Sequence, residues 1–466
     1  MKLKSIFILL LAFYLQTVNA QGPSAYTAEA AYDLINTIEP SPFAHTTHPD
    51  AQWFPSAGMG LFMHWGIHSV AALDPSWAMI KNCFWVKRDC PIATEDYYRL
   101  AEDFDPVAYD PEKWVLAARQ AGFQYMVLTA KHHDGYCLWP SKYGEWNTGK
   151  YMQGRDLLKP YVDACRKYGM KVGFYYSPRD WADPDYAHVF PFQDNDLNQK
   201  RVITLTPEES QQKFDHFFMT VIGQLSELLT RYGKIDVLWF DGVEWPRVNT
   251  YPDKVHAWLR TLQPGMVINP RWSTNGKGSF GDYKTEEGSW RGHLPEHPKK
   301  VNDGEWWEFC ESWSGHWGYS PLDKYRSLDQ VMKLLIYARS YGGNYLLNIG
   351  PAPDGTMRKG YYTECEKLAN WMKNNKESVI GTQAVPKWKE MSKYPMTKTD
   401  QAYYVHLLND TLNTIEITGI EKPNQAVWLD SGEKLSFKYL EGKKLLIDLN
   451  GERSHPLDAV IKIYSE

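Results

Sequence analysis

The 466-residue sequence has few cysteines and no large excess of charge of one sign. Only six residues are cysteine, and none are spaced as C-x-x-C, so a zinc or thioredoxin-like site is not indicated. The formal net charge is -5, which gives no reason to expect nucleic acid as a partner. With 43% hydrophobic and 23% charged residues, the chain is neither disordered nor a coiled coil. It is long enough for a large core and two domains.

Long apolar runs are also missing beyond the first 20 residues. Lys2 and Lys4, the apolar run 6–15 and the small-residue site Val18-Asn19-Ala20 are typical of a secretory signal peptide. This run is too short to span a bilayer, and no later segment is apolar enough to do so. We therefore expect an exported protein, periplasmic or secreted, with no membrane anchor.

Export would place the cysteines in an oxidising compartment. Cys83 and Cys90 are close in sequence within a loop-like stretch, where a disulfide is one option. Cys137, Cys165, Cys310 and Cys365 have apolar or helical surroundings, which predicts buried free thiols.

Aromatic residues, in contrast, are abundant: they make up 15% of the chain and include 20 tryptophans. Aromatic rings fill large cores, and they also cover the apolar C–H faces of sugars. The stretch that contains Trp306, Trp307, Trp313 and Trp317 suits either use, as core packing or as an aromatic loop that forms the wall of a sugar pocket.

Short apolar runs alternate with helical patterns over about 350 residues. Such repeated strand–helix units predict a parallel sheet, either a (β/α)8-like barrel or a doubly wound fold. The expected strands are 60–65, 125–130, 171–176, 235–240, 266–269 and 345–349, and the expected helices include 112–120, 156–168, the segment around 214–229, and 328–341.

The residues at the strand ends favour the barrel. His64, His132, His133, Asp241 and Arg271 lie at or just after the carboxyl end of a predicted strand, as do Tyr175 and Asn348. In a barrel these ends converge on one pocket. Neither a P-loop nor a G-x-S-x-G nucleophile elbow occurs. We therefore predict a (β/α)8-like barrel over residues 21–383.

After residue 383 the pattern changes to short alternating runs separated by turn residues, at 403–408, 414–418, 426–429, 444–449 and 460–464. This pattern predicts a C-terminal antiparallel β-sandwich over residues 384–466.

Asp241 is the strongest candidate for a catalytic residue. It ends the apolar strand Ile235–Phe240 and is followed by Gly242, although an aspartate in this place can also cap the next helix. A glycosidase would need a second carboxyl group to protonate the leaving oxygen. The candidates are Glu286, Glu287, Glu305 and Glu308; spacing does not choose among them, and each alone is typical of a solvated loop charge.

The histidines at the strand ends could bind a metal or hydrogen-bond to ligand hydroxyls. Because neighbours on a strand point to opposite faces, His132 and His133 are not expected to reach one ion. His64 completes no known metal motif, and we expect no metal and no cofactor.

At these residues the sequence resembles the α-L-fucosidases of glycoside hydrolase family 29. The stretches that carry the resemblance are GLFMHWGIHSV (60–70), YMVLTAKHHDGYCLWPSK (125–142), GRDLLKPYVDACRKYGMKVGFYYSPRDW (154–181), YGKIDVLWFDG (232–242) and GGNYLLNIGPAPDG (342–355). They span most of residues 53–382.

The resemblance implies a barrel with a C-terminal β-sandwich and metal-free retaining hydrolysis of terminal α-L-fucose. It places the nucleophile at Asp241 and the acid/base at Glu287, which lies in a region that varies within the family. The residues that match sugar-binding positions are His64, Trp77, His132, His133, Tyr175, Trp239 and Arg271. One departure is Ser76-Trp77, where many members have Glu-Trp; loop 78–95 is also atypical.

The function predicted from the sequence is therefore an exo-acting retaining α-L-fucosidase whose partner is a fucosylated oligosaccharide or glycoconjugate. One alternative is an exo-glycosidase for a related sugar such as α-L-galactose. The other is a non-catalytic glycan-binding protein on the same scaffold.

Overall fold

The computed structural model describes residues 27–39, 45–79, 92–189, 205–241, 248–272, 280–288, 304–322, 324–408, 413–449 and 457–465. The predicted signal peptide and the predicted pair Cys83 and Cys90 lie outside these residues. Cys137, Cys165, Cys310 and Cys365 are buried free thiols, as predicted. No helix within the described ranges has the length and hydropathy needed to cross a membrane.

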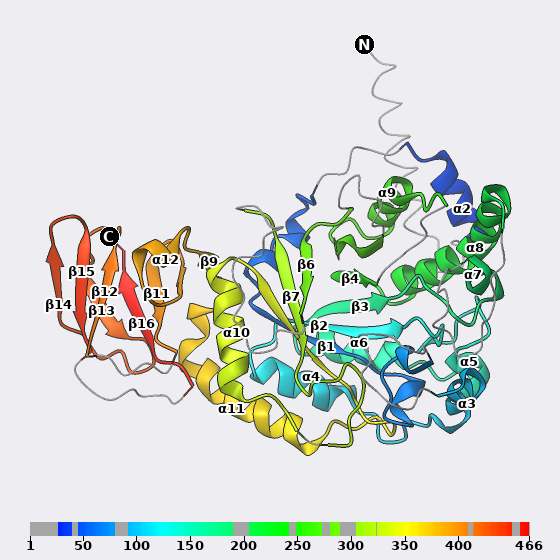
Figure 1. Ribbon diagram of the computed structural model, residues 1–466, viewed down its shortest axis with the longest axis horizontal. Helices are drawn as coiled ribbons and strands as arrows, with labels where there is room; N and C mark the ends of the chain where they lie inside the picture. Colours follow the sequence, from blue (N-terminus) through cyan, green and yellow to red (C-terminus); the bar gives the residue numbers. More distant parts are fainter. Residues whose placement is uncertain are drawn as a thin grey trace, which may run out of the picture.

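Eight parallel strands form a curled sheet in the order β5-β4-β3-β2-β1-β8-β7-β6 (Figure 1). Their bounds are β1 Met59–Met63, β2 Tyr125–Lys131, β3 Lys171–Tyr176, β4 Val237–Phe240, β5 Val267–Ile268, β6 Lys284–Glu287, β7 Trp307–Ser312 and β8 Asn344–Ile349. Strands β1, β2, β4, β7 and β8 are buried at every position, as strands covered on both faces must be. This arrangement confirms the predicted barrel-like α/β fold.

Two strands of this sheet were missed by the sequence pattern, which treated their residues as loops. Strand β7 is buried at every position but carries Glu308 and Glu311. Because charged residues are rarely buried unless they are paired, these two glutamates did not indicate a strand. Strand β6 is short, polar and half-buried, so it lacks the apolar signal altogether.

The two end strands of the curled sheet are connected by a side chain. The Asp282 backbone N–H donates to Ile268 O at 2.7 Å, and the Ile268 N–H donates back to Asp282 Oδ2 at 2.8 Å. Arg260 and the Thr46 N–H also donate to this fully buried carboxylate. Asp282 therefore joins β5 to the segment leading into β6, where no strand ladder is formed within the described residues.

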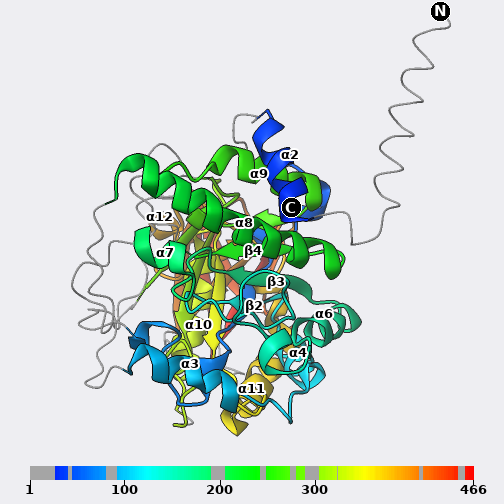
Figure 2. The same ribbon diagram turned by 90° about the vertical axis from the view of Figure 1, so that its right-hand side faces the viewer.

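The helices cover the outside of the sheet (Figures 1 and 2). The α-helices are α2 Ala28–Thr37, α3 Thr94–Asp103, α4 Pro111–Gln120, α5 Thr148–Tyr151, α6 Leu158–Lys167, α7 Pro184–Val189, α8 Pro207–Arg231, α9 Pro252–Leu262, α10 Leu328–Ser340, α11 Lys359–Asn375 and α12 Trp388–Met391. The long α8 begins with a capping box between Thr206 and Glu209, and its apolar face contains Phe214, Phe218 and Val221 as the spacing predicts.

The C-terminal part consists of two antiparallel sheets. One has the order β13-β16-β11-β10-β9 and the other β12-β15-β14. The bounds are β9 Gln383–Ala384, β10 Met396–Lys398, β11 Ala402–His406, β12 Thr414–Thr418, β13 Gln425–Trp428, β14 Phe437–Leu440, β15 Lys444–Asp448 and β16 Val460–Tyr464. Ile417 and Ile447 from the smaller sheet share a second core with Ile461 from the larger one, as in a β-sandwich.

Helix α10 lies between the two parts (Figure 1). The rings of Tyr337 and Tyr341 contact the Trp388 ring of α12 at centroid distances of 5.9 and 5.7 Å. The exact division into residues 21–383 and 384–466 stays a prediction.

Candidate active site

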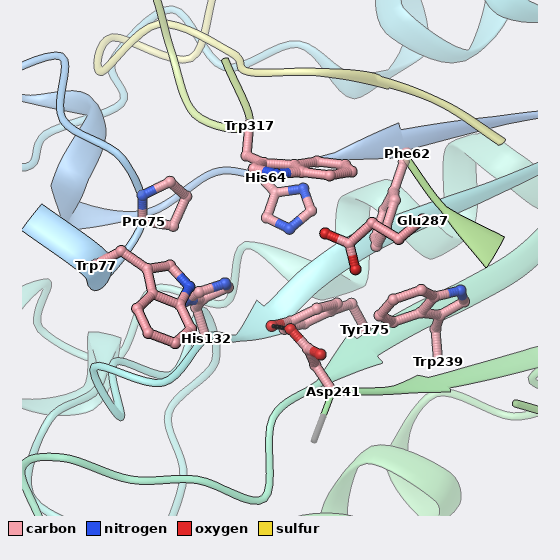
Figure 3. Close-up of a pocket in the computed structure, with 10 residues that line it drawn as sticks. All are labelled: Phe62, His64, Pro75, Trp77, His132, Tyr175, Trp239, Asp241, Glu287 and Trp317. Atoms are coloured by element: carbon pink, nitrogen blue, oxygen red, sulfur yellow. Dashed lines mark hydrogen bonds between the residues drawn. The ribbon is translucent and has the colours of Figure 1, made fainter. Parts of the chain in front are cut away.

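A pocket of about 360 Å³ opens at the carboxyl ends of the parallel strands (Figure 3). Half of its lining residues are Phe, Tyr or Trp, and the other half includes two residues with carboxyl groups and two histidines. The lining residues are Phe62, His64, Pro75, Trp77, His132, Tyr175, Trp239, Asp241, Glu287 and Trp317. Seven of the predicted residues therefore line one pocket: Asp241, Glu287, His64, Trp77, His132, Tyr175 and Trp239. In Figure 3 the carboxylates of Asp241 and Glu287 both point into it.

Asp241 follows β4 directly and is held on both carboxylate oxygens. Tyr175 Oη donates to Oδ2 at 2.7 Å, and the Arg271 guanidinium donates to Oδ1 at 3.1 Å. His133 Nε2 lies 3.5 Å from Oδ2. Burial acts to raise the pKa of Asp241, but the charges of Arg271 and Arg179 and the Tyr175 hydrogen bond outweigh it, so the net pKa is lowered. Asp241 is thus kept as a carboxylate with a fixed orientation.

Arg271 connects the two carboxyl groups of the pocket. Besides Asp241, its guanidinium donates to Glu287 Oε2 at 2.7 Å and to Thr285 Oγ1 at 3.2 Å. Its guanidinium carbon lies 4.6 Å from the centre of the Trp239 ring, a cation–π contact. Arg271 follows β5 in a short 3₁₀ turn, Pro270–Trp272.

The four rival glutamates occupy different environments. Thr285 and Glu287 point to the Arg271 side of β6, so the alternation along a strand directs Glu286 to the opposite side. Glu305 is half-buried just before β7 and is not among the described residues that line the pocket. Of the four, Glu287 is the one in the lining.

Glu308 corrects the expectation of a solvated loop charge. It is 1% exposed in the interior of the sheet, where Trp239 Nε1 donates to Oε1 at 2.9 Å and Tyr125 Oη donates to Oε2 at 2.5 Å. Burial raises the pKa of Glu308 to about 7, although these two donors and the charge of Arg271 act to lower it. The group therefore lies beneath the pocket, behind the Trp239 ring.

The histidines also differ from expectation. His132 and His133 follow the last residue of β2 in a turn, and Gly135 then has φ 81°. Because the turn ends the strand alternation, both rings approach Asp241: one ligand atom from each of these three residues lies within 4.8 Å of the others. The expectation that the two rings face opposite ways is wrong.

Three ligand atoms this close could in principle hold a metal ion. However, Asp241 already accepts hydrogen bonds from Tyr175 and Arg271, and a cation there would lie beside the Arg271 and Arg179 charges. The arrangement therefore suits a carboxylate that acts without a metal, and the absence of a metal stays a prediction.

The tryptophan-rich stretch divides its residues between core and pocket. Trp307 and Trp313 belong to the main core, Trp306 packs beside His45 and Phe54, and Trp317 lines the pocket. The buried strand β7 thus accounts for half of this stretch, and one of its four tryptophan rings, that of Trp317, is a pocket wall.

Phe62 and Pro75 line the pocket but were not predicted as site residues. Phe62 lies in β1, where every residue is buried and most are apolar. Hydrophobicity alone therefore does not show which of these side chains faces the pocket. Pro75 precedes Ser76-Trp77, a segment where only the tryptophan gave a signal. His133 and Arg271 contact Asp241 but are not part of the described lining.

Known proteins are similar to this chain in sequence and in fold. The family model for α-L-fucosidases matches residues 28–377. The chain belongs to the α-L-fucosidase family of glycoside hydrolases. Rat tissue α-L-fucosidase is 30% identical over 391 residues, which cover 78% of this chain and 77% of the rat protein.

Solved structures of the family agree with this membership. α-L-Fucosidase isoenzyme 1 from Paenibacillus thiaminolyticus is 29% identical with a TM-score of 0.76, covering 90% of this chain and 99% of its own. The Thermotoga maritima α-fucosidase in complex with a mechanism-based inhibitor is 25% identical with a TM-score of 0.67, covering 95% of this chain and all of its own. The barrel with a C-terminal sandwich is thus the architecture of this α-L-fucosidase family member.

Proposed function

We propose that this protein is an exo-acting retaining α-L-fucosidase that removes terminal α-L-fucose from oligosaccharides or glycoconjugates. The observation that carries the proposal is the bridge made by Arg271, whose guanidinium binds Asp241 and Glu287 at one aromatic pocket. Two carboxyl groups at one pocket are what glycoside hydrolysis requires.

In the first step Asp241 attacks the anomeric carbon of fucose, and the glycosidic C–O bond breaks. Glu287 gives its proton to the leaving oxygen, so the aglycone departs as an alcohol. In the second step water attacks the same carbon, Glu287 takes the proton of that water, and the bond to Asp241 breaks. The products are fucose with retained configuration and a regenerated pair of carboxyl groups.

The ion pair between Arg271 and Glu287 bears on the first step. To donate a proton, Glu287 must be neutral, and a neutral carboxyl binds a guanidinium more weakly than a carboxylate does. We therefore infer that substrate binding separates the 2.7 Å pair, while Arg271 keeps its contact with Asp241.

The apolar part of the lining supports a 6-deoxy sugar. Phe62, Trp239 and Trp317 present aromatic surface that gains free energy against a methyl group, whereas a buried hydroxyl without a partner would cost it. This favours L-fucose over L-galactose. The presence of both Asp241 and Glu287 in the pocket favours an enzyme over a glycan-binding protein.

The remaining proposals concern the chain as a whole. We propose that residues 1–20 direct export to the periplasm or the outside of the cell, and that residues 384–466 act as a structural brace for the barrel through α10.

The test is release of 4-nitrophenol from 4-nitrophenyl α-L-fucoside and from the α-L-galactoside, by wild type and by Asp241→Ala. We expect wild type to favour the fucoside, and Asp241→Ala to lose about 10⁴-fold or more in kcat. Asp253→Ala, on α9 and away from the pocket lining, is the matched control and should behave as wild type. Equal activity of Asp241→Ala and wild type would refute the nucleophile, and preference for the galactoside would refute the sugar.

The acid/base is tested with Glu287→Ala. Aryl substrates with good leaving groups need little protonation, so they should be affected less than natural glycosides, and azide should restore turnover by attacking the fucosyl-enzyme. The same pattern in Glu308→Ala or Glu305→Ala would reassign the role.

A further inference from the structure

Ser76 lies between two residues that line the pocket, Pro75 and Trp77, yet its own side chain is directed away from it. The residue is fully buried, and its backbone has φ 60°, a left-handed conformation unusual for a residue with a Cβ. Such a conformation persists where the surroundings hold the residue in place.

Hydrogen bonds hold Ser76 on both its backbone and its side chain. Ser76 Oγ lies 2.6 Å from His132 Nδ1 and 3.1 Å from Asp134 Oδ2, and it accepts the Asp134 backbone N–H at 2.9 Å. The Ser76 N–H donates to Tyr97 Oη at 2.8 Å, and Tyr97 Oη donates in turn to Asp134 Oδ2 at 2.7 Å. All four residues are buried.

The hydrogen atoms of this network can be placed in one way that satisfies every contact. Ser76 has one hydroxyl hydrogen. Asp134 accepts from Tyr97 and from the Tyr136 N–H, and these hydrogen bonds act against the burial that raises its pKa. As a carboxylate, Asp134 can only accept. If the hydroxyl pointed to His132, two oxygens would face each other at 3.1 Å with no hydrogen between them. The arrangement that satisfies every contact has Ser76 donating to Asp134 and His132 Nδ1–H donating to Ser76.

His132 is neutral, because burial lowers its pKa well below the usual value. With its single hydrogen on Nδ1, the other ring nitrogen, Nε2, carries a lone pair and faces the pocket that His132 lines. The ring is also fixed in orientation, since it stacks on Tyr175 at an interplanar angle of 3°.

His64 arrives at the same state through a different partner. Asn348 Nδ2 donates to Trp317 O at 2.8 Å, which leaves Asn348 Oδ1 to accept from His64 Nδ1 at 2.7 Å. Burial lowers the pKa of His64 to about 4, so its Nε2 is an acceptor as well.

We infer that Ser76, supported by Asp134, is a positioning residue that holds His132 in the Nδ1–H tautomer, so that His132 Nε2 accepts a hydrogen bond from a hydroxyl of the bound sugar. The part of this inference that concerns the sugar rests on the proposed function; the part that concerns the tautomer does not. A sugar whose corresponding oxygen is alkylated has no hydrogen to donate and would be rejected, which restricts the substrate to fucose residues that are free at that hydroxyl.

The first measurement is the tautomer itself, by long-range ¹H–¹⁵N correlation of ¹⁵N-histidine-labelled protein, with His132→Asn to assign the signal. We expect Nδ1 protonated in wild type, and a mixture or the opposite tautomer in Ser76→Ala. Alanine keeps the Cβ of serine and the backbone N–H bond to Tyr97 Oη, so the substitution adds no steric cost at φ 60°. Ser226→Ala, which removes another buried hydroxyl, on α8, is the control and should leave the His132 signal unchanged.

The second measurement is kcat/KM on aryl α-L-fucosides. We expect Ser76→Ala to lose about 10-fold, mainly through KM, and Ser226→Ala to lose nothing. In a set of monodeoxy fucosides, one should be cleaved equally by wild type and Ser76→Ala, because it lacks the hydroxyl that His132 binds.

An Nε2–H tautomer in wild type would overturn the inference, and so would an unchanged tautomer in Ser76→Ala. If Ser76→Ala does not fold, Asp134→Asn replaces it: an amide that donates to Ser76 Oγ turns the serine hydrogen to His132 and should invert the tautomer. Loss of all fucosidase activity in wild type would refute the proposed function while leaving the spectroscopic result to stand.

Discussion

The indole N–H of Trp239 donates to Oε1 of Glu308 at 2.9 Å, which ties a wall of the pocket to a carboxyl group beneath it. The same ring stacks on Tyr175, at 15° between the ring planes, and contacts Arg271. Both of those residues donate to Asp241. Glu308 is thus connected to Asp241, the proposed nucleophile, through the ring that it orients, without being among the described residues that line the pocket.

Truncation of Glu308 should damage both stability and activity. In Glu308→Ala the buried donors Trp239 Nε1 and Tyr125 Oη lose their acceptor, which should lower the free energy of unfolding by about 2–4 kcal/mol. Glu308→Gln can still accept from Trp239 and should retain most of kcat/KM. Urea unfolding and 4-nitrophenyl fucoside hydrolysis measure the two effects; equal loss of kcat in both variants would contradict an orienting role.

Glu308 should also make stability depend on pH. Burial raises its pKa from 4.5 to about 7, so between these values the folded protein holds a proton that the unfolded chain has released. Its stabilising contribution is complete below pH 4.5 and is lost as the pH rises through 7, by about 3 kcal/mol in all. The free energy of unfolding of wild type, minus that of Glu308→Gln, should therefore fall as the pH rises over this range. Parallel curves for the two proteins would refute the shift.

Arg271 should set the acid limb of the activity profile. Its charge lowers the pKa of Asp241 against the effect of burial, so Arg271→Met should raise that pKa and move the acid limb of kcat/KM to higher pH. Arg271→Lys keeps the charge but cannot bind both carboxylates as the fork does, so it should lose rate with a smaller shift of the limb. Arg119→Met, on the exposed end of α4, is the control. An unmoved limb in Arg271→Met would contradict the electrostatic role.

Asp282 should be essential to the closure of the sheet. Asp282→Ala leaves the Ile268 N–H and the Thr46 N–H without an acceptor and Arg260 without its ion pair, so we expect a loss of about 3–5 kcal/mol in unfolding free energy. Asp282→Asn keeps one acceptor and should lose less. Thermal and urea unfolding provide the measurement, and a loss below about 1 kcal/mol in Asp282→Ala would show that the connection is dispensable.

Much of the barrel could be predicted because its signals are local. The apolar runs of β1, β2 and β3 are continuous, and the residues that follow them are polar, so the strand ends and their side chains were identified from sequence. Strand β7 was missed because Glu308 and Glu311 interrupt the apolar pattern. Their partners, Trp239 and Tyr125 for the first and Arg326 for the second, come from other parts of the chain.

The site shows the same division. Asp241 and the histidines were identified by their position after strands, but the expectation for His132 and His133 failed because a turn, not a strand, carries them. Among the four candidate glutamates, only the register of β6 and β7 in space distinguishes Glu287, in the pocket, from Glu308, beneath it.

The sequence by itself determined the family, the alternation of strands and helices, and the residue types gathered at the strand ends, because these follow from periodicity and from short contiguous motifs. Only the tertiary structure decided which carboxyl group faces the pocket, that Arg271 binds both, and that Ser76 faces His132. Burial, charge proximity and hydrogen-bond direction depend on groups that are distant along the chain, and folding alone brings them within reach of one another.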